Sequence, residues 1–434
     1  MEHVRGIYMN REVVMPTLDK DERINNFNEV NVGLSESDTL KEANRCLNCK
    51  NPRCMLNCPV KIKIPEFISK IKEGDYDGAY EIIAESSSLS SICGRVCPQE
   101  NQCEKMCIRG LSGDAIMIGA LERFVSDHVN NRNILKKKNN GKKVALIGSG
   151  PSSLQCAYDL VINGYNPVIF EALQELGGVL RYGIPSFRLP KSLLDKEIDY
   201  LKSLGVEFHT NIVVGKTILL SELESTYDAI FIGTGAGLPK MLNIKGEEYL
   251  GVMSANELLT RVNLMSKSTP IKVGENAIVI GGGNVAMDAA RVLRRLGSKV
   301  TICYRKGESN LKARKEEINH AKEEGINFEF YLSPKEIRSN DDEHVSSMLF
   351  DSVSDSTTKE IETDMVVVAI GTNVNKLVLN NSNLENDNGL LKQVINDKYY
   401  AGGDVVSSSS TVVNAISQGK EAAINIMKEL DKNE

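Results

Sequence analysis

The 434-residue sequence has no run of about 20 apolar residues, the length that a helix needs to cross a bilayer. Its first residues, Met1 to Arg5, are not followed by the apolar core of a signal peptide. We therefore expect no membrane span and a cytoplasmic protein. The formal net charge of -6 is small for this length, so the composition gives no reason to expect nucleic acid as a partner.

No pair of redox-active cysteines occurs after residue 143, where Cys156 and Cys303 stand alone. This absence argues against a flavin-dependent disulfide reductase, and we expect both cysteines to be small core hydrophobes. The other eight cysteines lie between Cys46 and Cys107. Because thiols are kept reduced in the cytoplasm, such a dense group predicts metal ligands rather than disulfides.

The chain divides into a helical part and an α/β part. With 41% apolar and 25% charged residues it can fill two or three globular cores. Up to about residue 132, cysteine-bearing loops alternate with helical periods such as Ile64 to Ile71 and Ala115 to His128. After a polar linker, short β-branched runs alternate with amphipathic periods, which predicts parallel strands covered by helices.

Two α/β units are expected, the second inserted in the first. Strands are predicted at 144–148, 167–171, 206–210 and 229–233, and again at 277–280, 300–305, 328–331 and 365–371. Residues 399–404 and the helical period 411–430 then resume the first unit. The predicted fold is therefore α/β with an all-α N-terminal domain at 1–138 and two Rossmann-like units of the glutathione-reductase type, at 139–272 with 373–434 and at 273–372.

The first unit begins with a glycine-rich turn typical of dinucleotide binding. Gly148 permits the tight turn from strand to helix, and Gly150 lets the backbone approach a pyrophosphate at the helix N-terminus. Glu171 ends the next predicted strand, where its carboxylate can bind a ribose diol and disfavours a 2'-phosphate. Ser153 stands in the third position of the motif and adds a hydroxyl where helix and strand pack closest. We expect the fold to tolerate it, with a looser helix–strand contact as the alternative.

Further glycines favour FAD over NAD at this site, because a long extended ligand needs several close backbone passages. Gly178 and Gly403 provide them, and Asp404 can accept a hydroxyl of the ribityl chain. The helix that starts near Thr411 can point its N-terminus at the isoalloxazine. The alternative for Asp404 is an ordinary turn-forming role after glycine.

The second glycine-rich turn, with Gly281 and Gly283, is followed by a strand of opposite character. That strand ends in Arg305 and Lys306 rather than in a carboxylate. Guanidinium groups suit phosphate, so Arg305 with Lys312 or Arg314 predicts the 2'-phosphate of NADPH. Exposed basic residues without function remain the alternative. The candidate cofactor-binding residues also include Pro151, Ser152, Arg188, Val214, Gly235, Asn284, Val285 and Gly371.

The cysteine spacing is typical of iron-sulfur proteins. The first group follows C-x2-C-x4-C-x3-C-P from Cys46 to Cys58, and the second follows C-x3-C-P-x4-C-x3-C from Cys93 to Cys107. Eight thiolates suffice for two [4Fe-4S] clusters, and a closing Cys-Pro is typical of a ligand handed to a neighbouring cluster. Four-cysteine zinc sites are the main alternative.

Three strings resemble the glutamate synthase small (beta) subunit family: Ile92 to Glu100, Gly183 to Pro190 and Gly281 to Arg291. Two strings, Phe170 to Pro190 and Gly233 to Lys240, are most similar to one subgroup, the large subunit of NADH-dependent reduced ferredoxin:NADP oxidoreductase. The resemblance implies one cluster on Cys46, Cys49, Cys54 and Cys107, and another on Cys58, Cys97, Cys103 and Glu122, which would leave Cys93 without iron. Spacing alone would favour Cys93 over Glu122.

The expected function is electron transfer between NADPH, FAD and the two clusters, with no catalytic side chain because the cofactors do the chemistry. The resemblance implies a second redox subunit, either a ferredoxin-reductase-like flavoprotein or a glutamate synthase large subunit, and ferredoxin is a further candidate partner. Two alternatives stay open. One is a stand-alone enzyme acting on sulfide, polysulfide or another small molecule, and the other is a non-enzymatic iron-sulfur scaffold.

Overall fold

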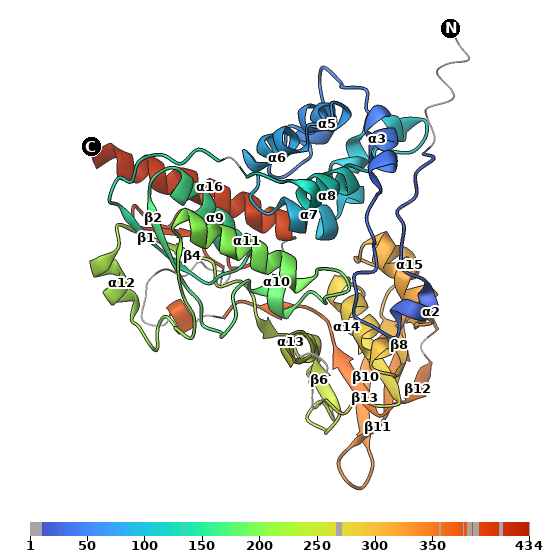
Figure 1. Ribbon diagram of the computed structural model, residues 1–434. Coiled ribbons are helices and arrows are strands. Elements are labelled where there is room, and N and C mark those ends of the chain that lie inside the picture. The colour runs from blue at the N-terminus through green and yellow to red at the C-terminus, as the bar shows by residue number, and fades with distance from the viewer. Residues whose placement is uncertain are drawn as a thin grey trace.

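The computed structural model describes residues 11–132, 134–265, 271–355, 357–375, 377–379, 384, 390–407 and 411–433. The segment Met1 to Arg5, on which the absence of a signal peptide was argued, lies outside these residues. A helical N-terminal domain rests on the first of two α/β units, and the second unit lies beside them (Figure 1). Within the described part of the chain, no helix is both long and apolar enough to cross a membrane.

The N-terminal domain is built from short helices, as predicted. Ser35 and Asp75 cap two of them, because their side chains accept hydrogen bonds from free backbone N–H groups of the first turn. The helices are α2 (Lys20–Arg23), α3 (Glu36–Asn44), α4 (Arg53–Leu56), α5 (Ile64–Lys72), α6 (Tyr76–Ala84), α7 (Ser90–Val96) and α8 (Ile118–His128), with 3-10 turns at Gln99–Asn101, Glu104–Met106 and Ile108–Leu111.

The first α/β unit has five parallel strands in the order β15-β4-β1-β2-β3. They are β1 (Lys143–Ile147), β2 (Asn166–Phe170), β3 (Glu207–His209), β4 (Ala229–Ile232) and β15 (Tyr399–Ala401). Helices α9 (Pro151–Ile162), α10 (Val179–Tyr182), α11 (Lys191–Leu204), α12 (Leu220–Thr226) and α16 (Val412–Leu430) accompany them. Since β15 pairs with β4, the chain returns to this sheet after the second unit, and the predicted insertion is confirmed.

The inserted unit has a second parallel sheet in the order β6-β13-β7-β8-β9. Its strands are β6 (Val252–Ser254), β7 (Asn276–Ile280), β8 (Lys299–Tyr304), β9 (Asn327–Phe330) and β13 (Met365–Val368), and its helices are α13 (Ala255–Met265), α14 (Asn284–Arg295) and α15 (Lys315–Glu323), with a 3-10 turn at Glu308–Asn310. Because β6 pairs with β13, this sheet begins before residue 273, where we expected the second unit to start.

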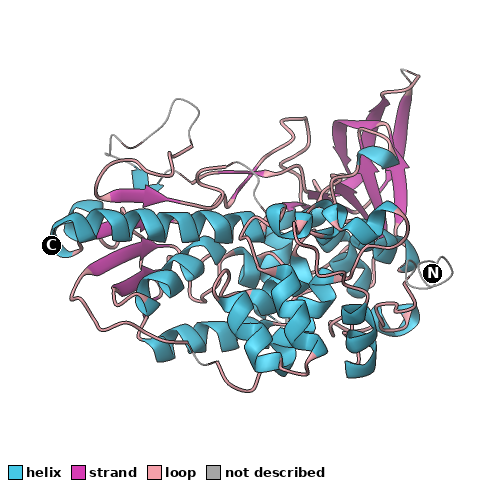
Figure 2. Cartoon of the chain, turned by 90° about the horizontal axis from the view of Figure 1, so that it is seen from above, coloured by secondary structure: helices cyan, strands magenta, loops and turns pink. Residues whose placement is uncertain are grey.

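A three-stranded antiparallel sheet between β9 and β13 was not predicted. It consists of β10 (Leu332–Ser339), β11 (Val345–Ser352) and β12 (Thr358–Glu362), and it lies at the opposite end of the molecule from the end of α16 (Figure 2). Tyr331 separates β9 from β10 with a φ of 61°, so one apolar run makes two strands in different sheets. A prediction that assumes alternating strands and helices does not include such an antiparallel sheet.

Two connections hold the units together. The chain crosses between the units in β5 (Leu238–Pro239) and β14 (Thr372–Asn373), which pair with each other. The N-terminal segment before α3 crosses to the inserted unit, where Val30 is buried in that unit's core and its N–H donates to Phe187 O at 2.9 Å. The helical domain itself shares one continuous apolar core with the first unit.

Candidate functional site

A single cavity of about 1610 Å³ lies between the two α/β units and is lined by both glycine-rich turns. Every candidate cofactor-binding residue except Arg314 lines it: Gly148, Gly150, Pro151, Ser152, Glu171, Gly178, Arg188, Val214, Gly235, Gly281, Gly283, Asn284, Val285, Arg305, Lys306, Lys312, Gly371, Gly403, Asp404 and Thr411. Parallel sheets bind ligands beyond the carboxyl ends of their strands, and here two such edges face one space.

The first turn joins β1 to α9 and leaves room for a ligand. Gly148 has a φ of 96°, and a Cβ there would lie 2.6 Å from Gly233 O, so only glycine fits. At Gly150 a Cβ would meet nothing within 4 Å. A packed turn with this empty space above it, at the N-terminus of α9, suits a pyrophosphate.

Ser153 does not loosen the contact between helix and strand. Its buried hydroxyl occupies the space that a Cβ on Gly233 would need, since that Cβ would lie 2.3 Å from Ser153 Oγ. The glycine on the neighbouring strand therefore compensates for the serine. The sequence contained both residues, but their opposition depends on the sheet order.

Glu171 lies directly after β2 and organises the loops around the first turn. Its buried carboxylate accepts hydrogen bonds from the backbone N–H groups of Ser149 and Leu173, each at 2.9 Å. Ser149 Oγ also donates to this carboxylate and accepts from Gly177 N at 2.9 Å. The acidic group thus keeps its position at the cavity wall, where a ribose diol would be recognised.

The C-terminal helix closes the other side of the first unit's site. Thr411 caps α16 by accepting from Asn414 N, and Gly403 N donates to Gln418 Oε1 at 2.7 Å. Helix α16 packs so closely on α9 that a Cβ on Gly419 would lie 2.0 Å from Ser152 O. The positive end of α16 is therefore held at the cavity wall.

The second turn joins β7 to α14 in the same way. A Cβ on Gly281 would lie 2.4 Å from Ala369 O, whereas at Gly283 the space is open to 4 Å. Arg305 and Lys306 follow β8 at the cavity wall, and Lys312 N donates to Gly282 O at 2.8 Å. Two exposed cations and a lysine attached to the turn thus surround the place where a second nucleotide would lie.

Arg314 points elsewhere, so the structure does not support it as a phosphate ligand beside Arg305. Its guanidinium donates to Arg95 O at 2.8 Å and to Gln99 Oε1 at 3.2 Å, both in the helical domain. Its backbone N–H donates to Asn284 Oδ1 at 2.9 Å, in the second turn. Arg314 therefore links the second glycine-rich turn to the segment that carries Cys97.

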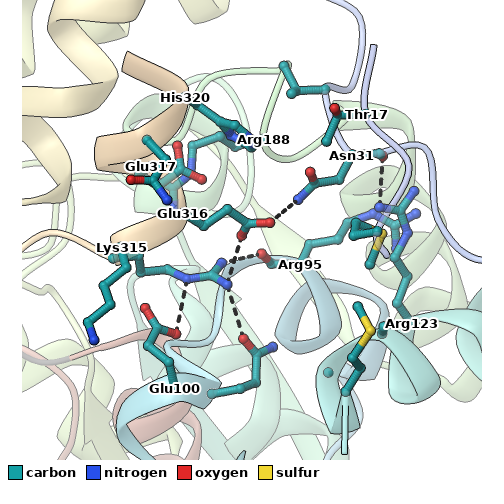
Figure 3. A pocket seen from close by; sticks show the side chains of 18 of the residues that line it. Thr17, Asn31, Arg95, Glu100, Arg123, Arg188, Lys315, Glu316, Glu317 and His320 are labelled. Atoms are coloured by element: carbon teal, nitrogen blue, oxygen red, sulfur yellow. Dashed lines mark hydrogen bonds and ion pairs between the residues drawn. The ribbon is translucent and has the colours of Figure 1, made fainter. Parts of the chain in front are cut away.

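A second, charged pocket of about 670 Å³ surrounds this link (Figure 3). Arg95 and Arg123 from the helical domain lie opposite Glu316 and Glu317 of α15 in Figure 3. Arg188, which also borders the main cavity, makes a buried ion pair with Asp288 at 2.7 Å and approaches Glu317 at 3.0 Å. Arg188 thus joins the first unit to the inserted unit, a role that its position in the sequence did not indicate.

The first cysteine group lies near the surface. Cys46, Cys49, Cys54 and Cys107 are partly exposed and close enough for their charges to interact. Burial raises the pKa of Cys54 to about 11, and the neighbouring thiols add to the shift. The raised pKa favours the protonated thiol, whereas bound iron would favour the thiolate, because coordination stabilises the deprotonated sulfur.

The second group is deeper and includes a carboxylate. Cys58, Cys93, Cys97 and Cys103 are buried around Glu122 of α8. Burial raises the pKa of Glu122 to about 8, and Glu122 Oε1 has no hydrogen-bond partner among the described residues. Leaving a buried carboxylate oxygen unpaired is costly, so the site suits a carboxylate that binds a cation.

Close helix packing brings this carboxylate to the thiols. A Cβ on Gly94 of α7 would lie 2.7 Å from Arg123 N of α8, so glycine is required at this helix contact. Among the described residues, no three histidine, cysteine or carboxylate side chains form a ready site for a single metal ion. The fit to iron clusters therefore rests on the two groupings and on the unpaired oxygen of Glu122.

The second cysteine group borders the main cavity. Val96 and Pro98, the neighbours of Cys97, line the cavity from the helical domain. We had not predicted these two residues as part of the site. A short C-P-Q-E string gives no signal of this contact, which depends on how the helical domain rests on the first unit.

Family comparisons agree with this arrangement. Residues 23–134 match the dihydropyrimidine dehydrogenase domain II model with a 4Fe-4S cluster, and residues 142–419 match the pyridine nucleotide-disulphide oxidoreductase model. The fold and the paired turns thus define an oxidoreductase of the dinucleotide-dependent class. Cys156 and Cys303 are buried, as expected, and no cysteine pair occurs in this part of the chain.

Two curated proteins are similar to this chain in sequence, and one solved structure is similar in fold. The NADPH glutamate synthase small chain of Escherichia coli K12 is 33% identical, over 93% of this chain and 94% of its own. The NADPH-Fe(3+) oxidoreductase subunit beta of Geobacter sulfurreducens is 37% identical over 68% of this chain and 45% of its own. Mycobacterium tuberculosis FprA in complex with NADPH has the same fold, with a TM-score of 0.57 and 20% identity over 67% of this chain and 85% of its own.

The chain belongs to the glutamate synthase small chain family of pyridine nucleotide-disulphide oxidoreductases. It is an NADPH-dependent oxidoreductase with an iron-sulfur domain, and its role is that of an electron-transfer subunit.

Proposed function

We propose that the chain passes electrons between NADPH and a partner protein by way of FAD and two [4Fe-4S] clusters. One observation carries the proposal: the cavity with two phosphate turns also touches Val96 and Pro98, the neighbours of Cys97. A flavin bound there would exchange a hydride with the nicotinamide and single electrons with iron. The surrounding residues of both α/β units would hold the two nucleotides in one cavity.

Each turn is assigned one nucleotide. Glu171 beside Gly148 and Gly150 suits the ribose of FAD, whereas the exposed cations Arg305 and Lys306 suit the 2'-phosphate of NADPH. The opposite charges at the ends of β2 and β8 support this division, because a carboxylate repels a second phosphate and a guanidinium attracts it. The FAD-binding domain would then comprise residues 139–272 with 373–434, and the NADPH-binding domain residues 273–372. The exception is β6, which lies within the first range but belongs to the sheet of the second unit.

The clusters are assigned to the two cysteine groups. Cys46, Cys49, Cys54 and Cys107 would hold the outer cluster, and Cys58, Cys97, Cys103 and Glu122 the inner one. The unpaired Oε1 of Glu122 favours the carboxylate as the fourth ligand. Cys93 would then lie beside the inner cluster without binding iron.

The partner is proposed to be a second redox subunit. The relatives carry the names small chain and subunit beta, which supports a larger assembly. Within the family, the strings around Gly183 and Gly233 favour a ferredoxin:NADP oxidoreductase over glutamate synthesis. We propose that the protein works in the cytoplasm, because the cysteines assigned to the clusters must stay reduced to bind iron.

Anaerobic purification tests the proposal. We expect about one FAD and about eight iron atoms per chain, as two [4Fe-4S] clusters require. The protein should oxidise NADPH with menadione as acceptor, but not with glutamine plus 2-oxoglutarate or with polysulfide. Colourless protein without flavin or acid-labile sulfide would refute the proposal, and turnover of polysulfide alone would indicate a stand-alone enzyme.

A further inference from the structure

One guanidinium of the inserted unit is buried beside the inner cysteine group. Arg314 stands directly before α15 and is only 8% exposed. Its Nη1 donates to Arg95 O at 2.8 Å, and its Nη2 donates to Gln99 Oε1 at 3.2 Å. These two acceptors belong to the residues two positions before and two positions after Cys97. The inserted unit therefore holds both sides of a segment that carries a proposed iron ligand.

Gln99 extends this contact to the two helices that carry Cys93 and Glu122. Its Nε2 donates to Cys93 O of α7 at 3.1 Å. It also packs tightly against α8, because a Cβ on Gly119, about one turn before Glu122, would lie 2.2 Å from Gln99 Nε2. Since Arg314 fixes the Gln99 amide, it also fixes the side chain that lies between α7 and α8 beside the inner thiols.

The charge of Arg314 acts on the inner cysteine group. Burial raises the pKa of Cys97 well above its usual value, and the positive charge of Arg314 opposes this rise. Two carboxylates accompany the guanidinium: Glu316 Oε2 lies 3.0 Å from Nη2, and Glu100 Oε2 lies 3.6 Å from Nε (Figure 3). Without Arg314 these carboxylates would leave uncompensated negative charge near the inner thiols. Buried charges are only weakly screened, so the loss of one cation there would be felt by a bound cluster.

We propose that Arg314 is a positioning residue for the inner cluster: it raises the reduction potential of the cluster and fixes the segment of Cys97. The inference rests on the proposed function and adds a residue that sets the potential of one cluster. In the step concerned, reduced FAD loses one electron and the cluster gains it, so the cluster becomes more negative by one charge. A nearby cation stabilises this reduced form, because the charge around a cluster contributes to its potential. The planar guanidinium also binds two acceptors in a fixed geometry, which an ammonium group does not.

The potential of each cluster is measured on the anaerobically purified, iron-loaded protein, so that the test does not depend on turnover. Electrochemical titration with mediators, extended to low potential by europium(II) chelates, is followed by the paramagnetic resonance of the reduced clusters. Cys97→Ala identifies the inner cluster, because the signal of that cluster should be lost. The rate of iron release to a chelator is measured on the same samples and reports how firmly the Cys97 segment is held.

Arg314→Met removes the charge and keeps an apolar side chain at this position. The ratio of reduced to oxidised inner cluster at a fixed potential should fall about tenfold, which is about 59 mV for one electron, and the outer cluster should not change. Arg314→Lys keeps the charge without the two-acceptor geometry, so the potential should largely return while iron release stays faster than in the unchanged protein. Glu100→Gln, which is nearly isosteric, should shift the inner potential upward, because Arg314 is then less compensated.

The matched control is Arg23→Met. Arg23 is a buried guanidinium whose Nε lies 3.2 Å from Glu324 Oε1, directly after the last residue of α15 and so at the opposite end of that helix from Arg314. The control therefore removes a buried ion pair of the same kind at a different place. Both cluster potentials should stay as they are in the unchanged protein.

The outcomes separate this inference from the proposed function. If the unchanged protein holds iron and oxidises NADPH, but Arg314→Met leaves the inner potential unchanged or shifts both clusters alike, the inference is wrong and the proposed function stands. An equal shift in Arg23→Met would also overturn it. If Arg314→Met loses its iron, Glu100→Gln decides, and an inner potential that does not rise in that variant overturns the inference. Unchanged protein that lacks iron and flavin would instead refute the proposed function.

Discussion

Arg305 provides the sharpest test of the NADPH assignment. It follows β8 at the cavity wall, is exposed and makes no ion pair with a described residue. The Arg305→Ala variant should therefore fold normally. A hydrogen bond to a charged group contributes about 1.5–3 kcal/mol, and solvent screening at an exposed site moves this toward the lower end. Since about 1.4 kcal/mol is a factor of ten, we expect kcat/KM for NADPH to fall about tenfold.

NADH lacks the 2'-phosphate, so its kcat/KM should change less than about twofold. Both cofactors are compared in steady-state assays with menadione, at low and high salt. The control is Arg338→Ala, an exposed arginine that pairs with Glu360 on the antiparallel sheet and should alter neither constant. Equal losses for NADPH and NADH would refute the reasoning, because they would show that Arg305 contacts a part common to both cofactors or acts on the fold.

Three further predictions concern the iron, the second turn and a buried carboxylate. Glu122→Ala should change the paramagnetic resonance spectrum or iron content of one cluster only, whereas unchanged spectra and iron would favour Cys93 as ligand. Gly283→Val should raise KM for NADPH at an unchanged Tm, because a side chain there enters the cavity, whereas Gly281→Ala should lower Tm, since its Cβ would meet Ala369 O at 2.4 Å. Burial raises the pKa of Asp159 to about 6, so its contribution to native stability is lost as pH rises from about 4 to about 6. This loss is up to roughly 3 kcal/mol of unfolding free energy at pH 8 and about half of that at pH 5, so Asp159→Asn should raise Tm more at pH 8 than at pH 5. A Tm gain equal at both pH values would contradict the last of these.

The charged pocket gives the site its rigidity. Breaking a buried ion pair typically costs about 3–5 kcal/mol, because the remaining charge stays desolvated. Arg188 with Asp288 and Arg314 with Gln99 therefore hold the inserted unit against the first unit and the helical domain. The two glycine-rich turns and the Cys97 segment are thus kept in one arrangement.

Local sequence patterns were enough for much of the fold. A glycine turn after an apolar run fixes strand, turn and helix through short-range sterics, so β1 with α9 and β7 with α14 could be predicted. The acidic Glu171 and the basic Arg305 each end the next strand along the chain, and their charges predicted which nucleotide each turn would bind. Cysteine spacing predicted iron in the same local way.

Contacts between segments that are far apart in the chain could not be predicted from local sequence patterns. The hairpin of β10 and β11 interrupts the α/β repeat, and β6 joins the second sheet through hydrogen bonds to β13, more than 100 residues later. Arg314 was a candidate phosphate ligand by its distance from Arg305 in sequence, yet its side chain reaches Arg95 O and Gln99 in the helical domain.

The sequence alone therefore determined most strands and helices of the two α/β units, the two glycine-rich turns and the residue types that could hold iron, because each depends on neighbours a few positions away. Only the tertiary structure decided that one cavity serves both turns, that Pro98 reaches it, and that Glu122 lies unpaired among the inner thiols. These results depend on packing between helices and sheets that are far apart in the chain, and packing is set by the fit of whole surfaces rather than by any local pattern.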